Sequence, residues 1–212
     1  MPLGYTIYKG FDLWADVPDH SDGQEVQHSQ RFVLLDNKTG AREADVLEPH
    51  PRHEYAWVAT AESEAAVDRL KTFVDDRRGR AVPFWLPSWH AITELAYDHT
   101  SVLVQSIFVR DVRLRDEWAL GPARQHIWLF NRDTLGGVPK PMVSCLKVAG
   151  FDYEEIYMGT TLGGTYKVLR ASVMRLYFVR MAADLVRIEW FGRNYAKFTI
   201  PIIEVPQEAP GP

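Results

Sequence analysis

The sequence has little cysteine and no long apolar run. Cys145 is the one cysteine among 212 residues, which excludes a framework of internal disulfides. No apolar run approaches the ~20 residues that a membrane-spanning helix needs. The N-terminus also lacks the charged and apolar regions of a secretory signal. We therefore expect a chain that is made and folded in a reducing cytoplasm, has no membrane span, and packs Cys145 as a small hydrophobic residue.

An excess of positive charge is also missing. The chain has 24 Lys and Arg against 28 Asp and Glu, a formal net charge of -4. Its densest basic group is Arg110, Arg113 and Arg115, and Asp111, Asp116 and Glu117 offset that group. Neutralising phosphates requires a dense basic face. The sequence thus predicts no nucleic-acid binding of its own.

Motifs that bind metals or phosphates are absent as well. Residues 16–23 bring three carboxylates and His20 together, but their spacing misses the calcium-loop pattern, which favours a solvated loop. His50 and His53 flank a Pro-Arg pair with no carboxylate or cysteine in register, so a loop is again favoured. Residues 159–165 lack the Gly-Lys-Ser/Thr ending of a phosphate-binding loop. We predict no metal and no cofactor.

Catalytic arrangements are equally scarce. There is no Gly-x-Ser-x-Gly motif, and nothing near Cys145 in sequence would lower its thiol pKa. Glu154 and Glu155 are adjacent, so in a strand they would face opposite ways and could not act as one carboxylate pair. The sequence predicts that the protein is not an enzyme.

What the sequence does contain is mostly strand pattern. Runs rich in β-branched and aromatic residues are bounded by turn formers. They occupy residues 5–8, 31–35, 54–58, 101–109, 125–130, 140–148, 172–179, 185–191 and 196–205. Short connections favour an antiparallel meander for the last three strands. The predicted fold is mainly β (α+β), an antiparallel sandwich or barrel flanked by one amphipathic helix, with a second β lobe.

The helix is expected at about residues 60–78. Val67, Leu70 and Phe73 follow a period of 3.6 residues and form one apolar stripe. Thr60 is the predicted N-cap, and Gly79 supplies the left-handed stop.

An apolar segment, residues 80–89, follows the helix directly. It reads Arg-Ala-Val-Pro-Phe-Trp-Leu-Pro-Ser-Trp, so that prolines and aromatic rings can bury area at low entropic cost. The pattern is typical of a packing or docking surface. For Trp85 and Trp89, both a core position and an interface position remain open.

Half of the chain resembles a known family. A strand with Tyr55 and Trp57, the helix, the Arg78-Gly79-Arg80 stop and the segment Pro-Phe-Trp-Leu-Pro at 83–87 are similar to the distal tail and minor tail proteins of long-tailed bacteriophages and gene-transfer agents. The closing strands, with Arg175, Asp184, Glu189-Trp190 and Ile203-Glu204, show the same likeness.

The resemblance implies a structural virion protein of the tail tip, assembled in the host bacterial cytoplasm. Residues 1–97 with 165–206 would form a ring-building β-sandwich, residues 98–164 an inserted β lobe, and 207–212 a flexible tail. Copies would close into a ring, expected to be a hexamer, joining the tail tube protein to the hub and fibre proteins. The expected assembly interface consists of Arg77, Arg78, Arg80, Phe84, Trp85, Pro87 and Trp89.

Two other classes remain open. A receptor- or carbohydrate-binding β module would use exposed Trp85 or Trp89 to stack on sugars. A small β-rich hydrolase would need a convergent acid and base, for which Glu189, Asp184 and His126 are the candidates.

Overall fold

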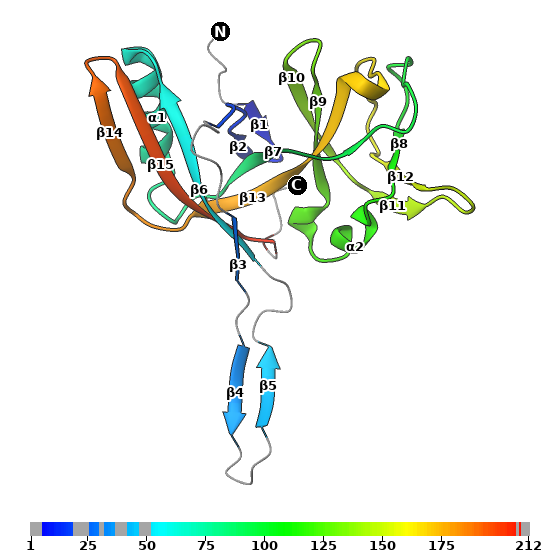
Figure 1. The fold of residues 1–212 in the computed structure, drawn as a ribbon, viewed down its shortest axis with the longest axis horizontal. Coiled ribbons are helices and arrows are strands. Elements are labelled where there is room, and N and C mark those ends of the chain that lie inside the picture. Colours follow the sequence, from blue (N-terminus) through cyan, green and yellow to red (C-terminus); the bar gives the residue numbers. More distant parts are fainter. Residues whose placement is uncertain are drawn as a thin grey trace. The chain divides into compact units, whose positions relative to one another are not determined.

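The protein is mainly β, as the sequence predicts. The computed structural model describes residues 6–18, 26–29, 32–36, 42–46, 52–206 and 208. Strands dominate these residues, and two α-helices lie among them (Figure 1). The chain divides into two compact units. The first unit comprises Met1–Val17, Pro83–Val179 and Val205–Pro212, and the second comprises Pro18–Val82 and Arg180–Glu204.

These boundaries differ from those expected at residues 97 and 165. The helix and the last strand do share a unit with Trp57, but residues 83–97 and 165–179 group with the middle of the chain. The predicted flexible tail lies largely outside the described residues.

The second unit contains a sheet with a helix beside it. Its strands are β3 (Val26–Ser29), β6 (Arg52–Ala61), β14 (Arg187–Gly192) and β15 (Tyr195–Glu204). Strand β15 pairs antiparallel with β6, placing Ile200 opposite Trp57, while β3 pairs with β6 and β14 with β15. A separate hairpin joins β4 (Phe32–Asp36) to β5 (Arg42–Val46). Inward residues alternate along β6 and β15, and this alternation builds the apolar face.

Helix α1 (Glu64–Asp76) confirms the predicted amphipathic helix and lies along β6 and β15. Val67, Leu70 and Phe73 are buried, as the stripe predicts. The predicted N-cap is wrong, because Thr60 belongs to β6 and Ser63 caps the helix by accepting a hydrogen bond from the N–H of Ala66 at 3.2 Å. Gly79 has a φ of +63°, the left-handed stop that was expected.

The first unit holds two sheets. In the larger one, β7 (Phe84–Glu94) and β9 (His126–Asn131) flank β13 (Ala171–Met181), which is antiparallel to both. Strand β10 (Gly136–Pro141) pairs with β9, while β1 (Thr6–Tyr8) and β2 (Phe11–Leu13) form a hairpin beside β7. The last two residues of β13 belong to the second unit.

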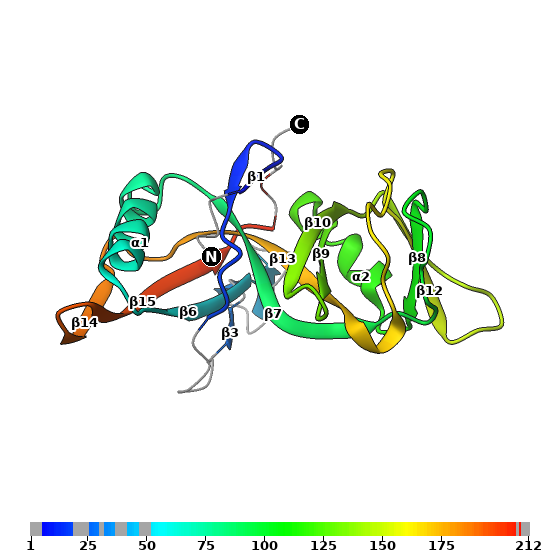
Figure 2. The same cartoon turned by 90° about the horizontal axis from the view of Figure 1, so that it is seen from above.

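The smaller sheet has the order β11 (Ser144–Lys147), β12 (Tyr153–Tyr157), β8 (Ser106–Arg110). Figure 2 shows β8 and β12 side by side. Helix α2 (Leu114–Trp118) follows β8, and two 3-10 turns occupy Pro122–Arg124 and Val168–Arg170. Ile107, Ile127, Leu129 and Ile156 belong to one apolar cluster that includes residues from both sheets.

Three strand predictions need correction. Residues 101–105 form a turn instead of the start of β8, because the backbone folds back on Ser101. The strand expected at 140–148 is split, since Met142 donates to the Gln125 carbonyl while Val143 donates to that of Tyr157. The last three strands are not a meander: Ala182 after β13 donates to Pro201 of β15, and β14 also pairs with β15.

Candidate functional site

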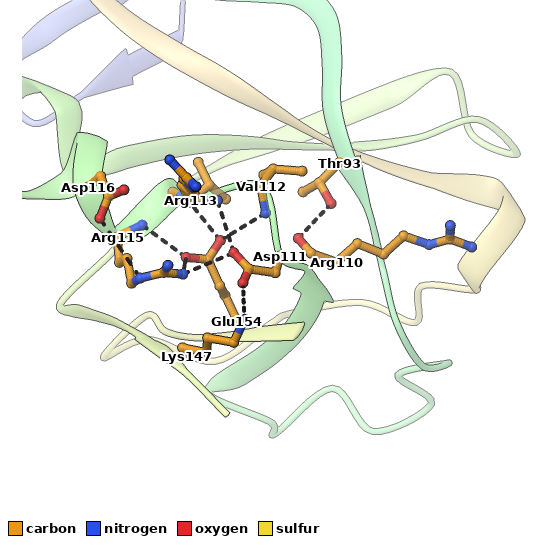
Figure 3. Close-up of polar contacts among 10 residues, drawn as sticks. Thr93, Arg110, Asp111, Val112, Arg113, Arg115, Asp116, Lys147 and Glu154 are labelled. Atoms are coloured by element: carbon orange, nitrogen blue, oxygen red, sulfur yellow. Dashed lines mark hydrogen bonds and ion pairs between the residues drawn. The ribbon is translucent and has the colours of Figure 1, made fainter. Parts of the chain in front are cut away.

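A buried carboxylate, that of Glu154, is the centre of a polar network in the first unit (Figure 3). Its Oε2 accepts hydrogen bonds from the backbone N–H groups of Leu114 at 2.9 Å and Val112 at 3.3 Å. Its Oε1 accepts from the N–H of Arg115 at 3.2 Å and from the Arg115 guanidinium at 2.7 Å. A buried charge is tolerated only when it is paired and hydrogen-bonded. Both oxygens of Glu154 meet that condition.

The start of α2 explains why the carboxylate is needed there. The first N–H groups of a helix have no partner within the helix, and Arg113, at the N-cap position, provides no side-chain cap. Arg113 also has a left-handed φ of 62°. Glu154, from a strand about forty residues later, takes the place of the missing cap.

Asp111 extends the network toward solvent. Its carboxylate accepts from the Lys147 ammonium at 2.5 Å, from the Arg115 guanidinium at 2.9 Å and from the N–H of Arg113 at 3.1 Å. The hydrogen bonds from Lys147 and Arg115 hold the pKa of Asp111 well below its usual value. Asp111 therefore remains charged under all ordinary conditions.

This network is best interpreted as structural. The two carboxylates already bind a shared guanidinium, an ammonium and four backbone N–H groups, so their acceptor positions face donors of the same chain. The network fixes the segment from Asp111 to Arg115 against β12.

A second buried polar contact joins His126 to the N-terminal hairpin. The Tyr8 hydroxyl lies 2.9 Å from Nδ1 of His126, and the ring of Trp85 lies 4.6 Å from the imidazole, centroid to centroid. Burial, with a smaller contribution from Lys9, lowers the pKa of His126 to about 4. The imidazole is consequently neutral and held among aromatic rings.

The depressed pKa of His126 predicts an acid-dependent loss of stability. In the unfolded chain His126 binds a proton near pH 6.5, whereas in the folded chain it does so only near pH 4. The contribution of neutral His126 to the free energy of unfolding is therefore complete above pH 6.5 and is lost as the pH falls toward 4. We expect a loss of about 3 kcal/mol over this range from this group. Urea unfolding at several pH values, in wild type and His126→Gln, measures the difference. An identical pH dependence in the two proteins would contradict the prediction.

In the second unit, His53 is paired with a buried acid. Its Nδ1 lies 2.5 Å from Oε2 of Glu204, and its backbone N–H donates to the same oxygen at 3.3 Å. The contact connects β6 to the end of β15. His50, which the sequence analysis considered together with His53 as a possible metal ligand, lies outside the described residues.

The residues of the predicted assembly interface are mostly interior. Phe84, Trp85 and Pro87 are buried in β7, so for Trp85 the core alternative is correct. Arg77 is also buried, with its guanidinium over the ring of Phe73 at 4.8 Å.

The remaining members of the predicted interface reach the surface to different degrees. Arg78 and Arg80 are exposed, and Trp89 is half-buried against Trp128 and Phe130. Trp89 has a φ of 51° at the irregular part of β7, where pairing with β13 shifts register.

The hydrolase candidates each have a partner of their own. His126 lies beside the Tyr8 hydroxyl, as described above. Asp184 accepts from the N–H of Arg80 at 3.3 Å, and Glu189 pairs with Arg187 at 2.8 Å. Each of the three side chains thus has a different partner.

The thiol and the loop candidates can also be placed. Cys145 is buried, as predicted, and burial raises the pKa of its thiol to about 12. Most of the acidic segment 16–23 lies outside the described residues. Across the described ranges, no group of three or more His, Cys, Asp or Glu side chains could hold a metal ion.

A cavity of about 350 Å³ opens in the first unit between the β9–β10 hairpin and the loop that ends at Tyr166. Its lining is rich in glycine and hydroxyl groups: Asn131, Thr134, Gly136, Gly137, Val138, Gly164, Thr165 and Tyr166. Gly137 packs on Trp128, because an added Cβ would lie 2.4 Å from its ring. The loop 159–165 is irregular, as the sequence suggests, and its end contributes one wall.

In comparisons with known proteins, no family model and no curated protein matches the chain. In the part of the chain that the structure describes, none of the helices is long and apolar enough to span a membrane.

Two features of these sites were missed at the level of sequence. Glu154 was rejected as half of a catalytic pair, yet it shares the inward face of β12 with Ile156, and that alternation is the signal of a buried acid. No sequence pattern pointed to Tyr166, because it lines the cavity only after distant segments of the chain have come together.

Proposed function

We propose that the protein is a structural component of a bacteriophage tail tip, a distal-tail-like subunit that assembles into a ring. The ring would join the tail tube to the hub and to receptor-binding fibres within the virion. The observation that carries this proposal is an exposed apolar patch on the edge of the second unit.

The β14 patch is the set of exposed apolar residues on or beside β14, namely Leu185, Trp190, Phe191 and Tyr195. The rings of Phe191 and Tyr195 lie 5.7 Å apart, centroid to centroid. Phe191 is 62% exposed and Trp190 52%, although large aromatic residues are normally buried. The Lys71 ammonium lies 5.3 Å from the ring centroid of Trp190 and covers that ring in part. Among the described strands, β14 pairs only with β15. Apolar residues beside an open strand edge are typical of a protein interface.

A second apolar patch lies on the first unit. Tyr97 and Phe151 are exposed there, and both contact Tyr153, with ring centroids 5.3 Å apart in each case. A closed ring of identical subunits needs two different complementary surfaces on every copy. The β14 patch and this Tyr97 patch differ in composition and lie on different units, which supports the ring proposal.

The proposal predicts that the β14 patch is required for assembly. Phe191→Ser should abolish ring formation, because it removes an exposed aromatic residue from the interface without disturbing the core. Native mass is measured over a range of concentrations, alone and with the tail tube protein of the same phage, and negative-stain images identify rings. Leu169→Ser is the matched control, because Leu169 is also an exposed apolar residue and lies outside both patches.

Rings formed by wild type and by Leu169→Ser, but lost in Phe191→Ser, would support the proposal. Wild-type chain that stays monomeric even with tail tubes present would refute it. Rings that persist in Phe191→Ser would refute the assignment of this patch.

A further inference from the structure

We propose that the β14 patch of one copy binds the Tyr97 patch of the next copy, and that Arg193 of the first forms an ion pair with Asp152 of the second. This inference rests on the ring proposed above and names the partner of each patch. It is carried by an arrangement that the two patches share with opposite charge. In each, two aromatic rings lie side by side, and one exposed charged residue stands between them in the sequence.

In the β14 patch the charged residue is Arg193. It lies in the turn between β14 and β15, after Phe191 and before Tyr195, whose rings are 5.7 Å apart. All three side chains are exposed. The acid of β14, Glu189, already pairs with Arg187, and within the described residues Arg193 has no ion pair. Its guanidinium is therefore available to a carboxylate of another molecule.

In the Tyr97 patch the charged residue is Asp152. It follows Phe151 and precedes Tyr153, and the rings of these two neighbours are stacked, with centroids 5.3 Å apart. The Asp152 carbonyl accepts from the N–H of Asp111 at 3.1 Å, which fixes the backbone at this point. The Asp152 side chain is exposed and, in the part of the chain that the structure describes, has no ion pair.

The surroundings of the two patches also have opposite charge. Residues 185–197 contain three basic side chains and one acidic one, a net charge of +2: Arg187, Arg193, Lys197 and Glu189. The charged residues next to the rings of the Tyr97 patch, in sequence or in strand register, are three acidic ones and one basic one, a net charge of -2: Asp98, Asp152, Glu155 and Arg110. Like patches would thus repel one another, whereas unlike patches attract. The charges favour the head-to-tail contact that a closed ring requires.

The aromatic rings give the ion pair its strength. An exposed ion pair contributes little to stability or binding because water screens it. Between Phe191 and Tyr195 on one copy and Phe151 and Tyr153 on the next, water would be displaced, and the attraction between the two charges would increase. Aromatic residues and arginine are also the residue types that contribute most to binding at protein interfaces.

The test reverses each charge in the full chain. Arg193→Asp and Asp152→Arg should each raise the concentration needed for ring formation at least about tenfold, because each places like charges opposite one another. The double variant restores the ion pair in the opposite direction and should assemble at the wild-type concentration. Arg170→Asp, an exposed charge reversal outside both patches, is the matched control. Rings are counted in negative-stain images, and circular dichroism checks that each variant is folded.

A mixing experiment tests which patch binds which. Phe191→Ser leaves the Tyr97 patch intact, and Phe151→Ser leaves the β14 patch intact. Each variant alone should stay monomeric by native mass. A mixture of the two should give a dimer that contains one copy of each and grows no further, because only one intact contact can form between them.

The outcomes separate this contact from the ring itself. Wild-type chain that forms no rings refutes the ring and this contact with it. Wild-type rings that persist in both charge reversals, or a double variant that assembles no better than the single ones, overturn the Arg193–Asp152 contact and leave the ring in place. Dimers formed by either serine variant alone would show that like patches bind each other, and would overturn it too.

Discussion

Replacing Glu154 with glutamine is expected to lower the free energy of unfolding of the first unit by about 3–5 kcal/mol, the usual cost of breaking a buried ion pair. The substitution keeps the shape of the side chain but removes the charge that satisfies Arg115. It also turns an amide N–H₂ toward backbone donors, so at least one of the N–H groups at Val112 and Leu114 loses its acceptor.

The effect should be local as well as large. Hydrogen exchange of the amides of Leu114 and Arg115 should accelerate, and urea unfolding should begin at a lower concentration. Glu155→Gln is the matched control, since that side chain points to the opposite face of β12 and is half-buried. A loss below ~1 kcal/mol in Glu154→Gln, or an equal loss in both variants, would show that the network does not hold α2 in place.

Trp85→Ala should destabilise the chain by about 3–5 kcal/mol, as expected for deleting a fully buried aromatic side chain. The indole ring lies 4.7 Å from that of Phe178 and 5.5 Å from that of Tyr8, centroid to centroid. Its N–H donates to the Tyr8 carbonyl at 3.0 Å. The substitution would therefore open a cavity and release the N-terminal hairpin together.

The melting temperatures of Trp85→Ala and Trp190→Ala compare the loss of a buried tryptophan with the loss of an exposed one. Trp190 is on the surface, so its removal should change stability by no more than about 0.5 kcal/mol. A Trp85→Ala protein with the melting temperature of wild type would show that β7 does not depend on its aromatic core.

Local patterns in the sequence were sufficient for the helix and most strands. The stripe of Val67, Leu70 and Phe73 predicts α1 because helix formation depends on neighbours three and four residues apart. Its N-terminus was misplaced because Thr60 and Ser63 are both good caps, and only the pairing of β6 with β15 decides between them. Strand length here is set by a partner far along the chain.

The candidate sites were less predictable for the same reason. Glu154 meets the start of α2 only because β12 pairs with β8, and Asn131 meets Thr165 only through the folding of a loop. The apolar segment after the helix was ambiguous between core and interface, since burial is decided by neighbours such as Phe178 and Tyr8. The spacing of residues along the sequence predicts neither these contacts nor the burial of the apolar segment.

The interleaving of the two units has a consequence for biosynthesis. Strand β6 emerges from the ribosome early, but its partner β15 is made only after the whole of Pro83–Val179. The second unit must therefore wait for the strand that pairs with β6 while the first unit is synthesised. The first unit in turn is closed by Val205, whose N–H donates to Phe178. Neither unit can finish folding on a nascent chain that stops short of β15 and Val205.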